Sequence, residues 1–164
     1  MTRWVTTVFG LGHLRPAPGT WASAAAIGAA VGLHYLGGFP LLMLATVAAT
    51  GLGFWACTGA LAGRPQDDPA EIVIDEVAGQ WLAFAFPAAA FWARGEPPAV
   101  LPWPAWVGAF LLFRLFDIWK PWLVGRADAR GGALAVMLDD LWAGVFAGVS
   151  VIVLGVAYHA YLFA

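Results

Sequence analysis

Long stretches without charged residues divide this chain into apolar segments. Residues 16–63 contain no Asp, Glu, Lys or Arg, and Gly37, Gly38 and Pro40 interrupt them near the middle. Because glycine and proline end helices, two helices fit this stretch better than one. The apolar pattern continues in three later segments. The sequence predicts five helices, over about 20–36, 40–62, 77–93, 104–119 and 141–163.

Only some of these segments are long enough to cross a membrane as a helix. At 1.5 Å per residue, a helix of roughly 17 residues reaches only ~25 Å, against a hydrocarbon core of about 30 Å. Segments 40–62 and 141–163 are long enough to span it, whereas the other three are short, and a re-entrant pair remains an alternative. We expect an all-α, polytopic membrane bundle of about five helices, some short or re-entrant, forming a single domain over residues 1–164.

The composition supports lipid as the solvent for most of the surface. Hydrophobic residues make up 62% of the 164 residues and charged residues only 11%. A domain of this size has too little interior to hide so much apolar surface from water, which excludes a soluble enzyme. The net charge of −2 gives no basic surface for nucleic acid. The single cysteine, Cys57, cannot form an internal disulfide.

The few charged residues gather at one end of the predicted helices. If the N-terminus lies in the cytoplasm and five spans follow, Arg94 and Glu96 are the only charged residues on the outer side. The excess of Lys and Arg on the inner side then satisfies the positive-inside rule. The sequence therefore predicts that any chemistry carried by charged groups takes place at the cytoplasmic face.

Two adjacent acids precede the third apolar segment. Asp75 and Glu76 stand between the apolar runs IVI and VAG. One interpretation is that they cap the helix, where the helix dipole favours negative charge. An ionisable pair at the lipid boundary is costly, however, and such pairs usually mark a functional site. We expect Asp75 and Glu76 to contribute to a site.

The end of the fourth segment carries charges of both signs. In FRLFDIWKPW, Arg114, Asp117 and Lys120 are spaced three residues apart. An Arg–Asp ion pair with a lysine that reaches the headgroups is the simplest interpretation. It accounts for Arg114, but not for an aspartate embedded between Phe116 and Trp119. Asp117 and Lys120 are therefore candidates for the same site.

A second acidic pair, Asp139 and Asp140, follows GGALAVML, and we place it at the start of the fifth helix. One of these acids is accounted for as a helix cap, but two adjacent like charges exceed what a cap needs. A cation is the natural way to offset their repulsion. Mg²⁺ prefers carboxylate oxygens together with substrate phosphate, and the chain offers few soft ligands for zinc or copper.

The start of the first helix, in RPAPGTWAS, is a candidate phosphate site. Thr20 and Ser23 are positioned to cap the first turn, and Gly19 allows a ligand to approach the backbone closely. Helix N-termini attract anions, and Arg15 adds positive charge. In the five-span arrangement, three helices begin at the inner face, so that three positive dipole ends meet the acidic residues there.

Taken together, four motifs resemble those of the phosphatidylglycerophosphatase A family, in the same order. They are GLGHLRPAPGTWASAAA, IVIDEVAGQW, FRLFDIWKPW and GGALAVMLDDLWAG, and they cover nearly the whole chain. The resemblance implies an all-helical enzyme of the bacterial inner membrane that uses Mg²⁺. Its implied reaction converts phosphatidylglycerophosphate, a phospholipid, to phosphatidylglycerol and phosphate.

The resemblance also implies a set of site residues. Arg15 departs from the family pattern and is not expected to be essential, and Gln80 stands where an apolar residue is common and receives no role. In the mechanism that we expect, one or two Mg²⁺ ions bind the acids of the two pairs, and Lys120 and Arg114 stabilise the phosphoryl oxygens. Asp117 is a ligand or positions the nucleophile. The implied residues are Thr20, Ser23, Asp75, Glu76, Arg114, Asp117, Lys120, Asp139 and Asp140.

Two other classes of function stay open at this point. A small transporter also uses carboxylates within the membrane, but they should lie near its midplane. A non-catalytic membrane subunit would use its acids only to cap helices. Attack by water and a phosphorylated carboxylate are alternative routes within the phosphatase hypothesis.

Overall fold

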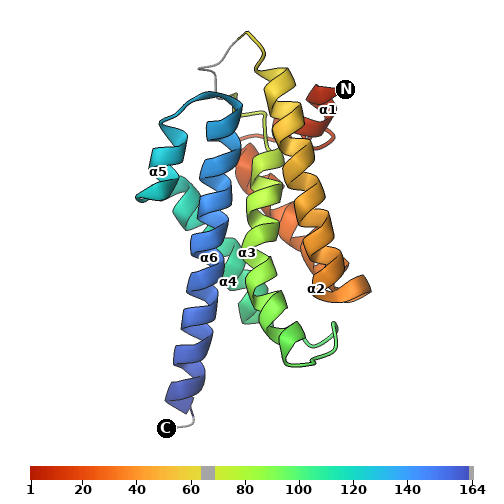
Figure 1. The fold of residues 1–164 in the computed structure, drawn as a ribbon, viewed down its shortest axis with the longest axis vertical. Coiled ribbons are helices and arrows are strands. Elements are labelled where there is room, and N and C mark those ends of the chain that lie inside the picture. The colour runs from red at the N-terminus through yellow and green to blue at the C-terminus, as the bar shows by residue number, and fades with distance from the viewer. Residues whose placement is uncertain (64–68, 163–164) are drawn as a thin grey trace.

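The computed structural model describes residues 1–63 and 69–162, and within them every regular element is helical (Figure 1). The prediction of an all-α fold is confirmed for this part of the chain. Asp67 and Asp68, two of the inner-face acids, lie outside the described residues. The elements are α1 (Thr2–Thr6), the short 3₁₀ helix η1 (Leu11–His13), α2 (Pro18–Ala60), α3 (Ile74–Ala93), α4 (Trp103–Trp119), α5 (Leu123–Asp128) and α6 (Gly132–Leu162).

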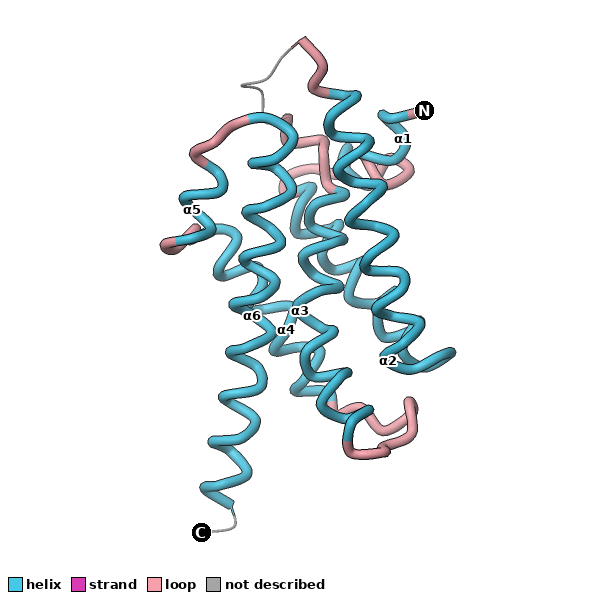
Figure 2. Tube along the Cα trace, viewed as in Figure 1, coloured by secondary structure: helices cyan, strands magenta, loops and turns pink. Residues whose placement is uncertain are grey.

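Helix α2 is broken near its middle, where the sequence predicts a break. Gly37 and Gly38 have non-helical backbone angles, and the φ of Gly38 is +65°, in the region that favours glycine. The ring of Trp92 occupies the space beside Gly38 that a side chain would need. The chain turns there and continues through Pro40, so segments 20–36 and 40–62 fall largely in two halves of α2 that run in different directions (Figure 2).

The remaining apolar segments fall in α3, α4 and α6, with one correction. Helix α6 begins at Gly132, well before Leu141, so that Asp139 and Asp140 lie inside the helix rather than at its start. The residues between Gly132 and Asp139 include Ala, Leu and Met, which are strong helix formers. The prediction that these two acids begin a helix, and the capping role that goes with it, are therefore wrong.

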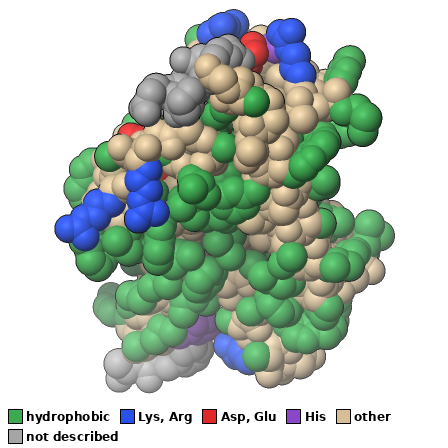
Figure 3. All heavy atoms as spheres, turned by 45° about the horizontal axis from the view of Figure 1, so that its top comes forward, with side chains coloured by type: hydrophobic (Ala, Val, Ile, Leu, Met, Phe, Trp, Pro, Cys, Tyr) green, Lys and Arg blue, Asp and Glu red, His purple; other side chains and the backbone are tan. Residues whose placement is uncertain are grey.

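Two helices, α2 and α6, are long and apolar enough to cross a membrane. Large aliphatic side chains on both face outward, among them Leu44, which is 68% exposed, and Val153, which is 60% exposed. Exposed apolar surface of this extent marks an interaction with lipid or protein rather than with water. The space-filling view shows a wide hydrophobic surface, with most of the visible Lys and Arg side chains at its margins (Figure 3).

Helix α3 packs between α2 and α6 and holds the two together. A Cβ atom on Gly79 would lie 2.5 Å from the backbone oxygen of Asp140, and one on Gly144 would lie 2.5 Å from the backbone oxygen of Gly79. On the other side, Nε1 of Trp81 donates a hydrogen bond of 2.8 Å to the carbonyl oxygen of Ala26. The small residues thus permit the close helix approach that brings the first turns of α3 beside Asp140.

Candidate active site

Three carboxylates from two helices meet at the start of α3. Asp75 and Glu76 lie in its first turn, and Asp140 comes from the third turn of α6. One oxygen from each of the three lies within 4.8 Å of the others. Asp75 is 8% exposed and Asp140 is 3% exposed. We call these three residues the acidic group.

Two oxygen atoms of the acidic group make no hydrogen bond within the described part of the chain. Oδ1 of Asp75 and Oε2 of Glu76 are buried without a hydrogen-bond partner. Both acids lie in the first turn of α3, where the helix dipole favours negative charge, but no side chain caps this helix by a hydrogen bond. Three neighbouring carboxylates repel one another, and a cation bound by their oxygens removes the repulsion. Oxygen ligands in this number suit a hard divalent cation such as Mg²⁺, so the residues fit the cofactor that the sequence predicts.

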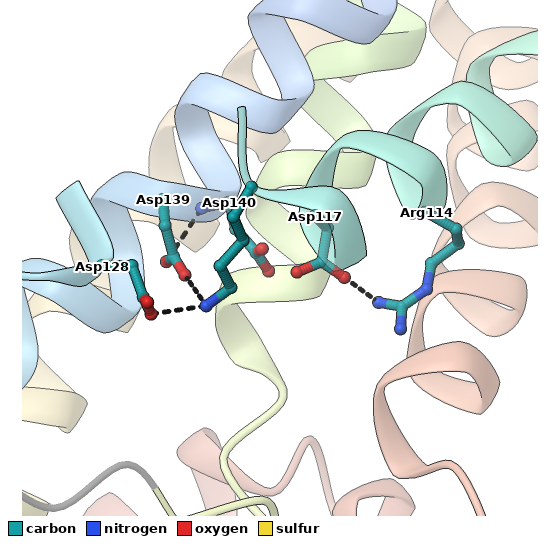
Figure 4. A network of polar contacts seen from close by, with 6 residues as sticks. Arg114, Asp117, Asp128, Asp139 and Asp140 are labelled. Atoms are coloured by element: carbon teal, nitrogen blue, oxygen red, sulfur yellow. Dashed lines mark hydrogen bonds and ion pairs between the residues drawn. The ribbon is translucent and has the colours of Figure 1, made fainter. Parts of the chain in front are cut away.

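Arg114 and Asp117 border the acidic group on the side of α4. Nη1 of Arg114 donates a hydrogen bond to Oδ2 of Asp117, and the two side chains are only 16% and 15% exposed. The carboxylates of Asp117 and Asp140 lie close to one another (Figure 4). Nε of Arg114 is buried without a partner. A guanidinium group beside carboxylates that would hold a cation is a suitable partner for phosphoryl oxygens.

Lys120 contacts Asp139, the residue that precedes Asp140 in α6. It ends α4 in the left-handed conformation, with φ of 49°, and α5 then folds back so that Asp128 lies beside it. Its Nζ atom donates to Oδ1 of Asp128 and, at 2.8 Å, to Oδ2 of Asp139 (Figure 4). Burial alone would lower the pKa of Lys120, but these two carboxylates raise it above its ordinary value, so the ammonium group stays charged.

Asp139 is therefore placed differently from its neighbour. Its Oδ2 accepts from Lys120, and its Oδ1 accepts from the backbone N–H of Asp140 at 3.0 Å. It does not belong to the acidic group, which consists of Asp75, Glu76 and Asp140. That Asp139 binds a metal stays a prediction, whereas its contact with Lys120 links α4 to α6.

The predicted phosphate-binding residues divide in two. Gly19 lies against the site, because a Cβ atom there would be 2.1 Å from Oε1 of Glu76 and 3.3 Å from Nη1 of Arg114. Ser23 is buried, and its hydroxyl donates a hydrogen bond of 2.8 Å to the carbonyl oxygen of Gly19. Thr20 is half-buried and Arg15 is exposed. The N-cap residue of α2 is Ala17, with no side-chain hydrogen bond, so the prediction that Thr20 and Ser23 cap this helix is wrong.

Comparison with known proteins assigns this arrangement to a family. The model of the family described as phosphatidylglycerophosphatase A matches residues 4–155. The chain belongs to the phosphatidylglycerophosphatase A family. Its members are lipid phosphatases, so the chain is a phosphatase enzyme. No solved structure matches it.

Individual relatives match most of the chain. A phosphatidylglycerophosphatase A from Haemophilus influenzae is 33% identical over 85% of this chain and 79% of its own length. The corresponding Escherichia coli protein is 30% identical over 84% of this chain and 73% of its own length. A Bacteroides thetaiotaomicron protein, provisionally named a phosphatidylinositol-3-phosphatase, is 34% identical over 87% of this chain and 86% of its own length.

Asp128 and Gln80 lie near the site, although neither residue received a predicted role from the sequence. Asp128 lies in a short polar stretch, and nothing in its sequence context indicates that α5 returns to Lys120. Gln80 follows Glu76 by one helical turn and is completely buried. The presence of a polar residue within the charge-free segment 77–93 could have indicated that Gln80 has a role.

Proposed function

We propose that this chain hydrolyses the terminal phosphomonoester of phosphatidylglycerophosphate, giving phosphatidylglycerol and inorganic phosphate. The observation that carries the proposal is the acidic group, buried beside Arg114 and Lys120 in a chain of this family. Acids that would hold a cation, next to two basic side chains, provide the charges that bind and activate a phosphomonoester.

Our proposal for the topology has five spans, with the N-terminus and the site at the cytoplasmic face of the bacterial inner membrane. The loop that carries Arg94 and Glu96 follows the end of α3 that is distant from the acidic group. This separation supports placing the two ends of the bundle at opposite faces. The phosphate of a lipid in the inner leaflet would then lie at the depth of the site, with its acyl chains between the apolar helices.

We propose Mg²⁺ as the cofactor, held by Asp75, Glu76 and Asp140. When bound, Mg²⁺ would neutralise phosphoryl charge and lower the pKa of a coordinated water. Arg114 and Lys120 would bind phosphoryl oxygens. Asp117, which accepts from Arg114, would fix the direction of the guanidinium group. Direct attack by water and a phosphorylated carboxylate remain alternative routes for the cleavage of the ester bond.

A phosphoinositide is the second candidate substrate, because one of the relatives is provisionally named for it. Both lipids carry a phosphomonoester on a headgroup derived from a polyol, so the same charged groups serve either. The transporter hypothesis is not favoured, because the acids lie near the starts of α3 and in the third turn of α6 rather than near the middle of the bundle. Membership of an enzyme family likewise disfavours a non-catalytic subunit.

The test is release of inorganic phosphate by the purified protein in detergent. The lipid substrates are phosphatidylglycerophosphate and phosphatidylinositol 3-phosphate, each assayed with Mg²⁺ and with EDTA. We expect hydrolysis of phosphatidylglycerophosphate that EDTA abolishes and that Asp75→Asn removes, while Glu96→Gln, a change in the distant loop, leaves it intact. Preference for the phosphoinositide would replace the proposed substrate, and activity that EDTA does not affect would contradict the cofactor.

A further inference from the structure

Gln80 is a buried amide without a hydrogen-bond partner. Its exposed fraction is 0%, and both Oε1 and Nε2 lack a partner among the residues that the structure describes. A buried polar group that makes no hydrogen bond costs about 1–3 kcal/mol, so such groups are rare in folded proteins. A partner that is acquired when a ligand binds is one way to account for it.

The position of Gln80 indicates which partner that is. Residues four apart share one face of a helix, so Gln80 lies one turn below Glu76 on α3. Helices α2 and α3 run in parallel here, since Gly19 contacts Glu76 and Ala26 bonds to Trp81. Gln80 falls between these two contacts, enclosed by the helix interface. The same helix face carries an unsatisfied acceptor, Oε2 of Glu76, which is also buried.

We propose that Gln80 is a positioning residue for the cation site, and that its Nε2 donates a hydrogen bond to the carboxylate of Glu76 in the cation-bound protein. The inference rests on the proposed function, specifically on a cation at the acidic group. A carboxylate has two oxygens that accept independently, so Glu76 can bind a cation and accept from Gln80 together. Partners of this kind orient metal-binding side chains and strengthen the metal site.

A substitution that keeps the volume but removes the amide isolates this role. Gln80→Met is expected to weaken binding of Mn²⁺, a spectroscopically visible substitute for Mg²⁺, by about tenfold or more. The binding is measured by electron paramagnetic resonance of the purified protein in detergent, without substrate. Thermal unfolding in EDTA, followed by tryptophan fluorescence, gives the second readout. Its midpoint should not fall, because the variant removes two unpaired polar atoms from the cation-free protein.

Thr46→Val is the matched control. Thr46 is also buried, at 2% exposure, but its hydroxyl donates a hydrogen bond to the carbonyl oxygen of Leu42 in its own helix, and it does not share a helix face with Glu76. This variant should bind Mn²⁺ as the wild type does. The comparison separates loss of a buried polar group in general from loss of the one beside Glu76.

Each outcome decides between specific statements. Weaker Mn²⁺ binding by Gln80→Met with an undiminished midpoint in EDTA supports the inference. Equal binding by Gln80→Met and the wild type overturns it and leaves the cation site in place. A lower midpoint in EDTA overturns it in favour of a structural role. If the wild type itself binds no Mn²⁺, the proposed cofactor fails and this inference with it, whereas the phosphatase activity is decided by its own assay.

Discussion

The ammonium group of Lys120 lies 2.8 Å from Oδ2 of Asp139, although the two residues belong to different helices. The neighbouring residue, Asp140, has no basic partner among the described residues and joins Asp75 and Glu76 instead. Successive residues of a helix point about 100° apart, so one adjacent pair of acids serves two different environments. Asp139 is paired with a lysine, whereas Asp140 joins a group of three carboxylates.

This difference predicts that the two aspartates respond differently to substitution. Asp140→Asn removes a member of the acidic group, and we expect it to raise the Mg²⁺ concentration for half-maximal phosphate release by at least about tenfold. Asp139→Asn should change that concentration much less and lower the thermal unfolding midpoint, because it leaves Lys120 with only Asp128. A larger effect of Asp139→Asn on the Mg²⁺ titration would show that Asp139 is itself a ligand.

Lys120 is expected to matter for the rate rather than for cation binding. Lys120→Met removes a positive charge beside the proposed phosphoryl position, and losing one such donor lowers kcat by about 10²–10³. The Mg²⁺ requirement should stay near that of the wild type. Arg126→Met removes a basic residue of α5 that forms no ion pair with the site among the described residues, and it serves as the control. Equal kcat values for Lys120→Met and the wild type would exclude Lys120 from the reaction.

The raised pKa of Lys120 fixes the direction of its pH dependence. A lysine whose folded-state pKa lies above its unfolded value stabilises the protein below the unfolded pKa and loses this contribution as the pH rises through the folded value. The stabilisation by Lys120 should therefore be constant between pH 7.5 and pH 9, well below the ordinary lysine pKa of about 10.4. Unfolding midpoints of the wild type and Lys120→Met across this range should differ by a constant amount. A difference that disappears between these limits would contradict the ion-pair arrangement.

Much of the fold follows from local features of the sequence. The break in α2 at Gly37 and Gly38 and the helical character of α3 and α4 were predictable because apolar runs and helix-breaking residues act over a few positions. The start of α6 was predicted wrongly. The predicted helix began after the charged residues Asp139 and Asp140, but the apolar, helix-forming residues before Asp139 already belong to α6. Charged residues indicate where a chain leaves the membrane, but a helix can continue beyond that boundary.

The site was predictable as a set of residues but not as an arrangement. Asp75, Glu76 and Asp140 were expected to act together, and the structure does bring them together. The division between Asp139 and Asp140 depends on the direction in which α5 returns after Lys120, which is a property of the tertiary fold. The burial of Gln80 depends likewise on how α2 packs against α3, and no local pattern around it carries that information.

Gly19 is predicted to tolerate no side chain if the site is to work. In Gly19→Ala the new methyl group would meet Oε1 of Glu76 at 2.1 Å, and that carboxylate is the movable end of a side chain. The fold should therefore survive while Glu76 is displaced, and misplacement of about 1 Å can cost as much as 10²-fold in rate. Phosphate release and the unfolding midpoint are measured together. Gly28→Ala, where a Cβ atom would meet nothing within 4 Å, should lower neither.

The crossing of α3 and α6 should be less tolerant, because backbone meets backbone there. A Cβ atom on Gly144 would lie 2.5 Å from the carbonyl oxygen of Gly79, which has no flexible end that can give way. Gly144→Ala must push α3 and α6 apart, at an overpacking cost of about 1–3 kcal/mol. Asp140 would then move away from Asp75 and Glu76. We expect a lower unfolding midpoint together with weaker Mn²⁺ binding. Gly155→Ala, in the same helix but in open surroundings, should lower neither. If Gly144→Ala bound Mn²⁺ like the wild type, the close crossing would not be what holds Asp140 beside Asp75 and Glu76.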